Sequence, residues 1–261
     1  MLARGETEGI FQLESTGMTQ VLVGMRPKNL EDIIALISLY RPGPMDSIPT
    51  YLRNRKDPSH VTYKTPQMAH IVDVTNGVVI YQEQVMQICR ELAGFSFGQA
   101  DNVRRAMSKK KLKVMEAERE HFVHGCKEPG KECAGCVANG VPENIANEIY
   151  DDMISFASYA FNKSHAACYA YVAFQTAYLK CHYPHEFMAA LLTSVLDVSD
   201  KISEYIQAAR DMGIAVLPPD VNESYDEFSV AGENIRFGLA AAIRSPGTFL
   251  SQFGIITSAS N

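Results

Sequence analysis

Apolar residues recur along most of this chain at the three- and four-residue spacing of amphipathic helices. The pattern predicts helices near residues 30–37, 85–93, 99–123, 145–160, 164–181, 184–196 and 202–212. Pro42 and Pro44 prevent the first helix from continuing, and Gly94 and Gly213 suit the ends of two others. Residues 45–77 show no such period and are predicted to be irregular. The chain is therefore predicted to be mainly helical.

A different pattern begins after Gly213. Residues 214–217 are strand-like, and the apolar segments 227–230 and 235–239 flank a polar turn in the manner of a β-hairpin. Residues 78–81 form a further candidate strand. The predicted fold class is mainly α, with a few short strands and a small β-hairpin segment near the end of the chain.

Composition and length describe an ordinary globular protein. The chain has 261 residues, of which 46% are hydrophobic and 21% charged, which is enough for one large domain or two smaller ones. The longest uncharged run, about 164–179, is shorter than the ~20 residues that a bilayer span needs. No signal-peptide pattern opens the chain, so we expect no membrane, a cytoplasmic location and reduced cysteines.

Charge is distributed unevenly along the sequence. The net charge is −6, yet residues 104–113 hold six lysines and arginines and no acid. A phosphate-bearing partner, either a nucleotide or a nucleic acid, explains such a block better than solubility does. A solvated helix face is the alternative interpretation.

Two further segments could bind the same chemistry. The segment Phe161–His165 precedes a predicted helix, whose free amides and dipole attract anions, and Lys163 and His165 add side-chain donors. An ordinary helix cap with a buried histidine is the alternative. Arg41 lies in a Pro-Gly-Pro turn that would hold its guanidinium at low entropic cost, although it could equally face solvent.

Metal-binding and catalytic motifs give a mixed picture. Cys126, Cys133 and Cys136, with His124 just upstream, offer zinc ligands in the loop 125–142, although an exposed reduced loop or a redox-labile pair is the alternative. The glycine-rich phosphate loops and the G-x-S-x-G signature are absent. No two aspartates have the D-x-D spacing frequent in two-metal phosphoryl transfer, so the sequence offers phosphate ligands without an evident transfer centre.

Several segments together resemble one family, the alpha subunit of bacterial DNA polymerase III, a replicative family C polymerase. They occur in the order found in that family, and the resemblance runs from about Glu8 to Ile243. The segments are Gly9–Ser15, Tyr40–Pro44, Tyr81–Met86, Arg104–Met107, Lys109–Lys111, Phe161–His165, His182–Phe187 and Leu217–Asn222. The sequence resembles the fingers region of such a polymerase.

The resemblance assigns roles to the basic residues. It implies that the triphosphate of an incoming deoxynucleotide meets Arg104 and Arg105, with Lys163, Ser164, His165 and Arg41 nearby. It implies that the DNA backbone follows Lys109, Lys110, Lys111 and Lys113. The palm of such a polymerase carries the aspartates that bind Mg²⁺, and this sequence resembles only the fingers. The Mg²⁺ ligands are therefore not expected in this chain.

The resemblance also implies a domain plan and partners. Residues 1–213 would form the fingers, with the loop 125–142 as an insertion, and residues 214–243 would begin a β-containing linker and helix–hairpin–helix region. Residues 244–261 form a divergent tail, so the chain is expected to be truncated at both ends, with a missing C-terminal region.

The expected partners are template-primer DNA, deoxynucleoside triphosphates, the missing palm and other subunits of the polymerase III holoenzyme, in a cytoplasmic, nucleoid-associated location. Alone, the chain is expected to be inactive. Two alternatives are a non-catalytic fragment that binds nucleic acid or nucleotide, and a non-functional gene remnant.

Overall fold

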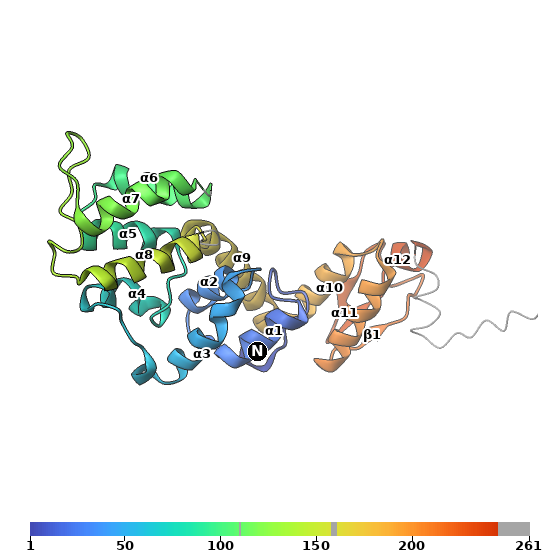
Figure 1. The fold of residues 1–261 in the computed structure, drawn as a ribbon. Helices are drawn as coiled ribbons and strands as arrows, with labels where there is room; N and C mark the ends of the chain where they lie inside the picture. Colours follow the sequence, from blue (N-terminus) through green and yellow to red (C-terminus); the bar gives the residue numbers. More distant parts are fainter. Residues whose placement is uncertain (110, 158–160, 245–261) are drawn as a thin grey trace, which may run out of the picture. The chain divides into compact units, whose positions relative to one another are not determined.

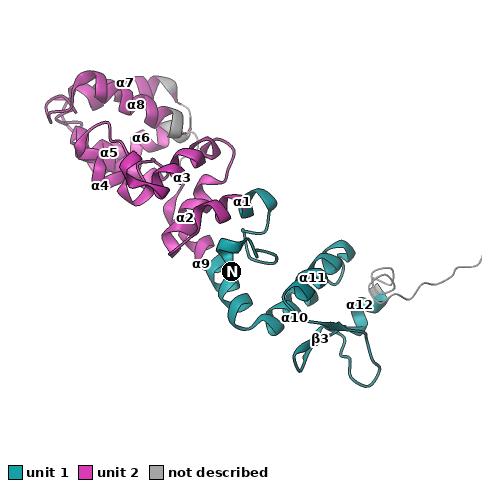
Figure 2. Ribbon diagram, turned by 90° about the horizontal axis from the view of Figure 1, so that it is seen from below, with its two compact units in different colours: residues 1–19, 172–261 teal, residues 20–171 magenta. Residues whose placement is uncertain are grey.

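The computed structural model describes residues 1–109, 111–157 and 161–244, which group into two compact units (Figure 2). One unit comprises residues 20–171, and the other comprises residues 1–19 together with the chain from 172 onward. The predicted DNA-binding Lys110 and the tail from 245 onward lie outside the described residues. The domain boundaries expected at 213 and 243 stay predictions.

Helices make up most of the described chain, as predicted. No described helix is both long enough and apolar enough to cross a bilayer. The helices are α1 (Thr16–Met25), α2 (Leu30–Leu39), α3 (Ile48–Lys56), α4 (Ala69–Val72), α5 (Gln82–Ala93), α6 (Phe97–Ser108), α7 (Leu112–His124), α8 (Glu143–Ala157), α9 (Lys163–His182), α10 (Pro184–Ser194), α11 (Ser199–Asp211) and α12 (Leu239–Arg244).

In the larger unit, α5, α6, α7 and α8 pack against one another (Figure 1). Their shared core contains the fully buried side chains of Leu92, Phe122 and Tyr150. Helix α5 ends as predicted at Gly94, whose φ of 73° lies in the left-handed region that glycine adopts without strain. This shared core fixes the positions of α5 and α6, including their polar ends.

The prediction that residues 45–77 are irregular was wrong, because the segment contains α3 and α4. Helix α3 buries only Ile48, Tyr51 and Asn54, so its apolar stripe is too thin to be recognised in the sequence. Tertiary contacts hold it instead. The Asn54 amide donates to the carbonyl of Asn76 at 2.8 Å, and Arg55 pairs with Asp32.

The single helix predicted for residues 99–123 is two helices, α6 and α7. The backbone of Lys111, with φ −82° and ψ 77°, is not helical, and its amide donates back to the carbonyl of Ala106 at 3.0 Å. The turn lets α6 and α7 pack on each other and bury Val103 and Phe122 in one core, which a straight helix could not do. Lys109 and Lys111 therefore lie in a connection between helices rather than on one helix face.

The candidate strand 78–81 is not a strand. Tyr81 makes an isolated parallel bridge with Phe161. After these two residues the pairing does not continue, because Tyr81 is the residue before α5, and Asn162, the next residue after Phe161, directly precedes α9. The bridge joins the entrances of two helices that are far apart in sequence.

The smaller unit contains the predicted hairpin. Strands β2 (Ser229–Ala231) and β3 (Asn234–Arg236) pair antiparallel, and β1 (Val216–Leu217) pairs parallel with β3, which is the central strand. Helices α10 and α11 pack on this sheet. Leu192, Ile206 and Ile235 are fully buried between them, so the helices and the short sheet share one core.

A glycine in the loop after α7 gives a test of this fold. Gly125 has φ 85° and ψ 177°, and a Cβ there would lie 2.4 Å from the carbonyl oxygen of Ala134. We expect Gly125→Ala to lower the free energy of unfolding by roughly 3 kcal/mol, since both the backbone conformation and the contact with a second backbone segment are unfavourable. Urea denaturation of the purified chain measures this.

Gly130→Ala is the matched control. Gly130 also has a positive φ, of 81°, but a Cβ there would meet no atom within 4 Å. Only the unfavourable backbone conformation applies here, so the free energy of unfolding is expected to fall by about 1 kcal/mol. Equal losses for the two variants would contradict the close approach at Gly125.

Candidate functional site

The candidate site is the first turn of α9, where two of the sequence motifs meet. The Phe161 amide donates to the Ile80 carbonyl at 3.2 Å, and the Gln82 amide donates to the Phe161 carbonyl at 3.0 Å. These two hydrogen bonds fix the start of α9 against the start of α5. The motif beginning at Tyr81 and the motif Phe161–His165 thus form one structural feature.

Two amides of the first turn of α9 donate to side-chain acceptors. The Asn162 side chain caps the helix, accepting the His165 amide at 2.9 Å. The Lys163 amide donates to both carboxylate oxygens of Glu83, at 3.1 and 3.2 Å. The Lys163 ammonium pairs with Glu31 at 3.0 Å. A carboxylate therefore occupies the end of the helix dipole where an anion binds favourably.

Arg104 and Arg105 on α6 share one carboxylate, that of Asp101 one turn earlier. Arg104 donates from Nε and Nη2 at 2.8 and 2.6 Å, and Arg105 Nε lies 2.6 Å from the other oxygen. The Arg104 guanidinium holds the pKa of Asp101 below its ordinary value, so this carboxylate is ionised at neutral pH. Arg104 also donates from Nη1 to the Gln82 side chain at 3.0 Å, which ties α6 to the start of α5.

Arg41 reaches the same motif from another direction. Its guanidinium carbon lies 4.0 Å from the centroid of the Phe161 ring, a cation–π contact. The Phe161 ring also contacts His165 edge-on at 5.3 Å between centroids. The turn that holds Arg41 is thus placed beside the entrance of α9.

The structure brings together most of the predicted nucleotide-binding residues. Gln82 links Arg104 to the α5–α9 junction, Phe161 links Arg41 to it, and Ser164 and His165 are exposed in the first turn of α9. The predicted DNA-binding Lys109, Lys111 and Lys113 are also exposed. Within the described residues their ammonium groups have no carboxylate partner.

Sequence reasoning missed the acidic and amide partners of these cations. Asp101 had a local signal, because it stands three and four residues before the arginines that it pairs with. Glu31, Gln82 and Glu83 had none, since their partners lie far away in the sequence. The site carries four cationic side chains against three carboxylates, so an entering polyphosphate would exchange with carboxylates already in place.

The predicted zinc ligands are not gathered into a metal site. The backbones of Cys126 and Cys133 form an isolated antiparallel bridge. Burial raises the pKa of the Cys136 thiol to about 12. The Nε2 atom of His124 lies 3.7 Å from a carboxylate oxygen of Glu143. Nowhere in the described ranges do three or more histidine, cysteine or acidic side chains converge in a way that could hold a metal ion. The described residues therefore fit neither a zinc site nor a Mg²⁺ site.

Comparison with known proteins relates the chain to one family. Residues 1–130 match the model of the bacterial DNA polymerase III alpha subunit finger domain, and residues 213–246 match a helix–hairpin–helix motif model. The chain is 53% identical over 246 residues to DNA polymerase III subunit alpha of Thermus aquaticus, which covers 92% of this chain and 19% of that protein.

Two other relatives carry the same name. The protein of Bacillus subtilis (strain 168) is 47% identical over 247 residues, 95% of this chain and 21% of that protein. The protein of Deinococcus radiodurans is 46% identical over 248 residues, 92% of this chain and 18% of that protein. The chain spans about a fifth of the length of the curated relatives that it matches.

Proposed function

Because the chain belongs to the family of bacterial DNA polymerase III alpha subunits, we propose that it forms part of the fingers of a DNA-directed DNA polymerase and holds the triphosphate of the incoming deoxynucleotide. One observation carries this proposal. Cationic residues from three separate parts of the chain, around 41, 104 and 163, are tied to the first turn of α9.

The proposed chemistry is positioning and charge neutralisation. Arg104 and Arg105 bind phosphate oxygens, since a guanidinium matches phosphate with paired donors. Lys163 and the exposed side chains of Ser164 and His165 bind the neighbouring phosphate at the start of α9. Arg41 adds a further positive charge. In phosphoryl transfer, charges held in place in this way stabilise the transition state without taking part in bond making.

The triphosphate replaces carboxylates as it binds. Asp101 and Glu83 accept hydrogen bonds from the groups that would bind phosphate, so each is displaced when the nucleotide enters. A triphosphate carries more charge than the carboxylates that it replaces, which favours the exchange. The exchange also disfavours nucleosides without phosphates, since they cannot replace the lost pairs.

DNA is the second proposed ligand. Lys109, Lys111 and Lys113, with Lys110 between them, follow the backbone of template-primer DNA, and residues 213–246 add a helix–hairpin–helix contact. The remaining partners are the palm and other subunits of the polymerase III holoenzyme, in the cytoplasm at the nucleoid. The catalytic Mg²⁺ ions belong to the palm, so no step is assigned to a metal on this chain.

Nucleotide titration tests the proposed triphosphate site. We expect the chain to bind dATP at least about 100-fold more tightly than deoxyadenosine, because two or more charge-assisted hydrogen bonds to phosphate are worth about 3 kcal/mol together. Isothermal titration calorimetry measures both affinities. Similar affinities for the two ligands would contradict a site that recognises phosphate.

Primer extension tests where catalysis resides. The purified chain is expected to add no nucleotide to a primed template in the presence of Mg²⁺, since its described residues offer no carboxylate cluster for the metal. An intact DNA polymerase III alpha subunit in the same assay is the positive control. Extension by the chain alone would contradict the proposal that the palm supplies the metals.

The helix–hairpin–helix match favours a second candidate function, a DNA-binding fragment that never acts on nucleotides. The two candidates differ in one measurement. The fragment would bind DNA but would bind dATP and deoxyadenosine alike.

A further inference from the structure

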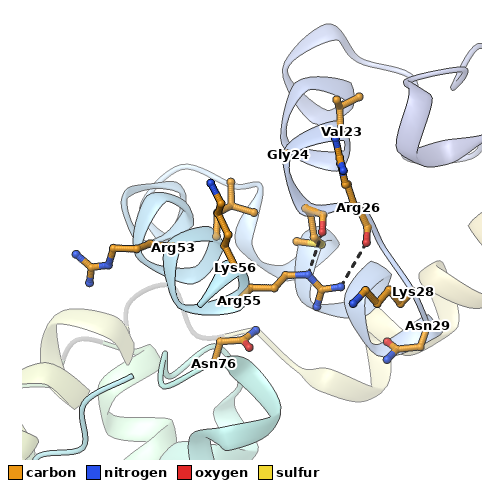
Figure 3. Close-up of a pocket in the computed structure, with 11 residues that line it drawn as sticks. Val23, Gly24, Arg26, Lys28, Asn29, Arg53, Arg55, Lys56 and Asn76 are labelled. Atoms are coloured by element: carbon orange, nitrogen blue, oxygen red, sulfur yellow. Dashed lines mark hydrogen bonds between the residues drawn. The ribbon is translucent and has the colours of Figure 1, made fainter. Parts of the chain in front are cut away.

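A second basic feature lies in the larger unit, and it shares no residue with the candidate site at α9. The end of α1, the start of α2 and the last turns of α3 border an open pocket of about 930 Å³ (Figure 3). Five of its lining residues are cationic and none is acidic, on a chain whose net charge is −6. The cationic residues are Arg26, Lys28, Arg53, Arg55 and Lys56.

One of the five cationic side chains, that of Arg55, already has hydrogen-bond partners within the protein. Arg55 donates to both carboxylate oxygens of Asp32, at 2.5 and 2.7 Å, and from Nε to the carbonyl of Met25 at 2.9 Å. The last contact satisfies a carbonyl at the end of α1, where the helix dipole is negative. Arg55 thereby links α3 to α1 and α2. It also neutralises the negative charge of the Asp32 carboxylate at the pocket.

The other four cations are free to bind a ligand. Arg26, Lys28, Arg53 and Lys56 are exposed, and none of their side chains has a hydrogen bond or ion pair with any residue that the structure describes. Elsewhere in the same unit, Lys64 and Arg119 each pair with a carboxylate. Four unpaired cations around one pocket repel one another, and an anionic ligand relieves that repulsion.

The backbone holds one of these cations in an uncommon conformation. Arg26 has φ 48°, in the left-handed region that few residues other than glycine adopt. Its carbonyl accepts from Arg55 at 3.5 Å, and its amide donates to Leu22 at 2.9 Å. These contacts keep Arg26 at the rim of the pocket, so the cationic rim is built into the fold at this point.

We propose that this pocket binds the phosphodiester backbone of a nucleic-acid strand. Figure 3 shows Arg53 and Lys56 on α3 and Lys28 on the segment before α2, with Arg55 between them. Long cationic side chains on both sides of an open pocket fit a strand that passes through it and is held by its phosphates. A small ligand is usually held in a more enclosed and more apolar site.

The inference goes beyond the lysines of 109–113, which the proposed function assigns to DNA. Only the choice of nucleic acid over another polyanion rests on that proposed function. The basic pocket itself does not depend on the triphosphate site at α9, because it shares no residue with it. The two proposals can therefore fail separately.

The test compares two double variants of the full 261-residue chain. Arg53→Gln/Lys56→Gln removes two free cations of the pocket, and Lys127→Gln/Lys131→Gln removes two exposed charges from the loop after α7. Fluorescence anisotropy with a labelled single strand of about 20 nucleotides, from about 0.05 to 0.3 M NaCl, measures affinity and its salt dependence.

At about 0.1 M NaCl we expect the pocket variant to bind about 10-fold more weakly than the wild type. The slope of log K against log[salt] should become shallower by about 1.4, for two lost phosphate contacts on a single strand. The loop variant should stay within about 2-fold of the wild type. An equal loss in both variants, or wild-type binding by the pocket variant, overturns the proposal.

Two further ligands identify the source of the phosphate. Inorganic tripolyphosphate and dATP are titrated into the wild type and the pocket variant, and neither affinity should change. A loss of tripolyphosphate affinity as large as the loss of DNA affinity would overturn a strand-binding pocket in favour of a small polyphosphate. If the wild type fails to bind dATP but the pocket variant still loses DNA affinity, the triphosphate site fails and this inference stands.

Discussion

Replacing Arg104 and Arg105 together with glutamine is expected to weaken dATP binding about 100-fold, since each charge-assisted contact with phosphate contributes about 1.5 kcal/mol or more. Both guanidiniums are presented on α6 by the carboxylate of Asp101, and Arg104 is also held by Gln82. The glutamines remain polar, but they are shorter than arginine and lose the positive charge. Isothermal titration calorimetry with dATP measures the change.

The structure offers a companion variant with the opposite expected sign. Asp101→Asn removes the carboxylate that competes with phosphate for both arginines, so we expect it to tighten dATP binding about 3- to 10-fold. Deoxyadenosine affinity should not change in either variant, because the nucleoside has no group for these arginines. A double arginine variant that binds dATP like the wild type would contradict the site, as would weaker binding by Asp101→Asn.

The pH dependence follows from the same pair. The pKa of Asp101 lies below its ordinary value of 3.8 because Arg104 donates a hydrogen bond to the ionised form. The stability that this pair contributes is therefore fully present above pH 3.8 and is lost as the pH falls through the lowered pKa. At neutral pH the carboxylate always competes with the nucleotide, so protonation of Asp101 cannot change dATP affinity between pH 6 and 8.

The helices that bury a regular apolar stripe were predictable from the sequence. Ile37 and Ile88 lie on such stripes, and the glycine after α5 marked its end. Helix α3 was missed because it is held by Arg55 and Asn54, whose partners are distant in the sequence. The turn at Lys111 was missed because the packing of α7 against α6 requires it, and no proline or glycine marks it.

The candidate site was predictable in its cations but not in its assembly. A basic block and a polar segment before a helix can be recognised in the sequence, and they indicated Arg104, Arg105 and Lys163. That these residues converge depends on a single backbone bridge between Tyr81 and Phe161, for which hydrophobic periodicity gives no signal. The four free cations of the α1–α3 pocket come from short segments around 26 and 53, and the sequence does not show that the fold places these segments around one pocket.

Replacing Asp32 with alanine is expected to cause one of the largest losses of stability that a single substitution can produce in this chain. The Asp32 carboxylate is buried, with 5% of the residue exposed, and it accepts two bonds from Arg55 and one from the Lys28 amide at 2.7 Å. Its removal leaves the Arg55 guanidinium largely buried without its counter-charge. Breaking a buried pair in this way costs about 3–5 kcal/mol.

Guanidinium chloride unfolding of the wild type and four variants, Asp32→Ala, Arg55→Ala, Asp32→Ala/Arg55→Ala and Glu31→Ala, tests this expectation. Glu31→Ala is the matched control, since Glu31 is next in sequence on α2 but makes an exposed pair with Lys163 whose loss should cost no more than about 1 kcal/mol. Asp32→Ala/Arg55→Ala should lose less than the sum of the two single variants, because the double variant leaves no uncompensated charge. Strict additivity, or equal losses for Asp32→Ala and Glu31→Ala, would contradict the view that one buried ion pair holds α1, α2 and α3 together beneath the basic pocket.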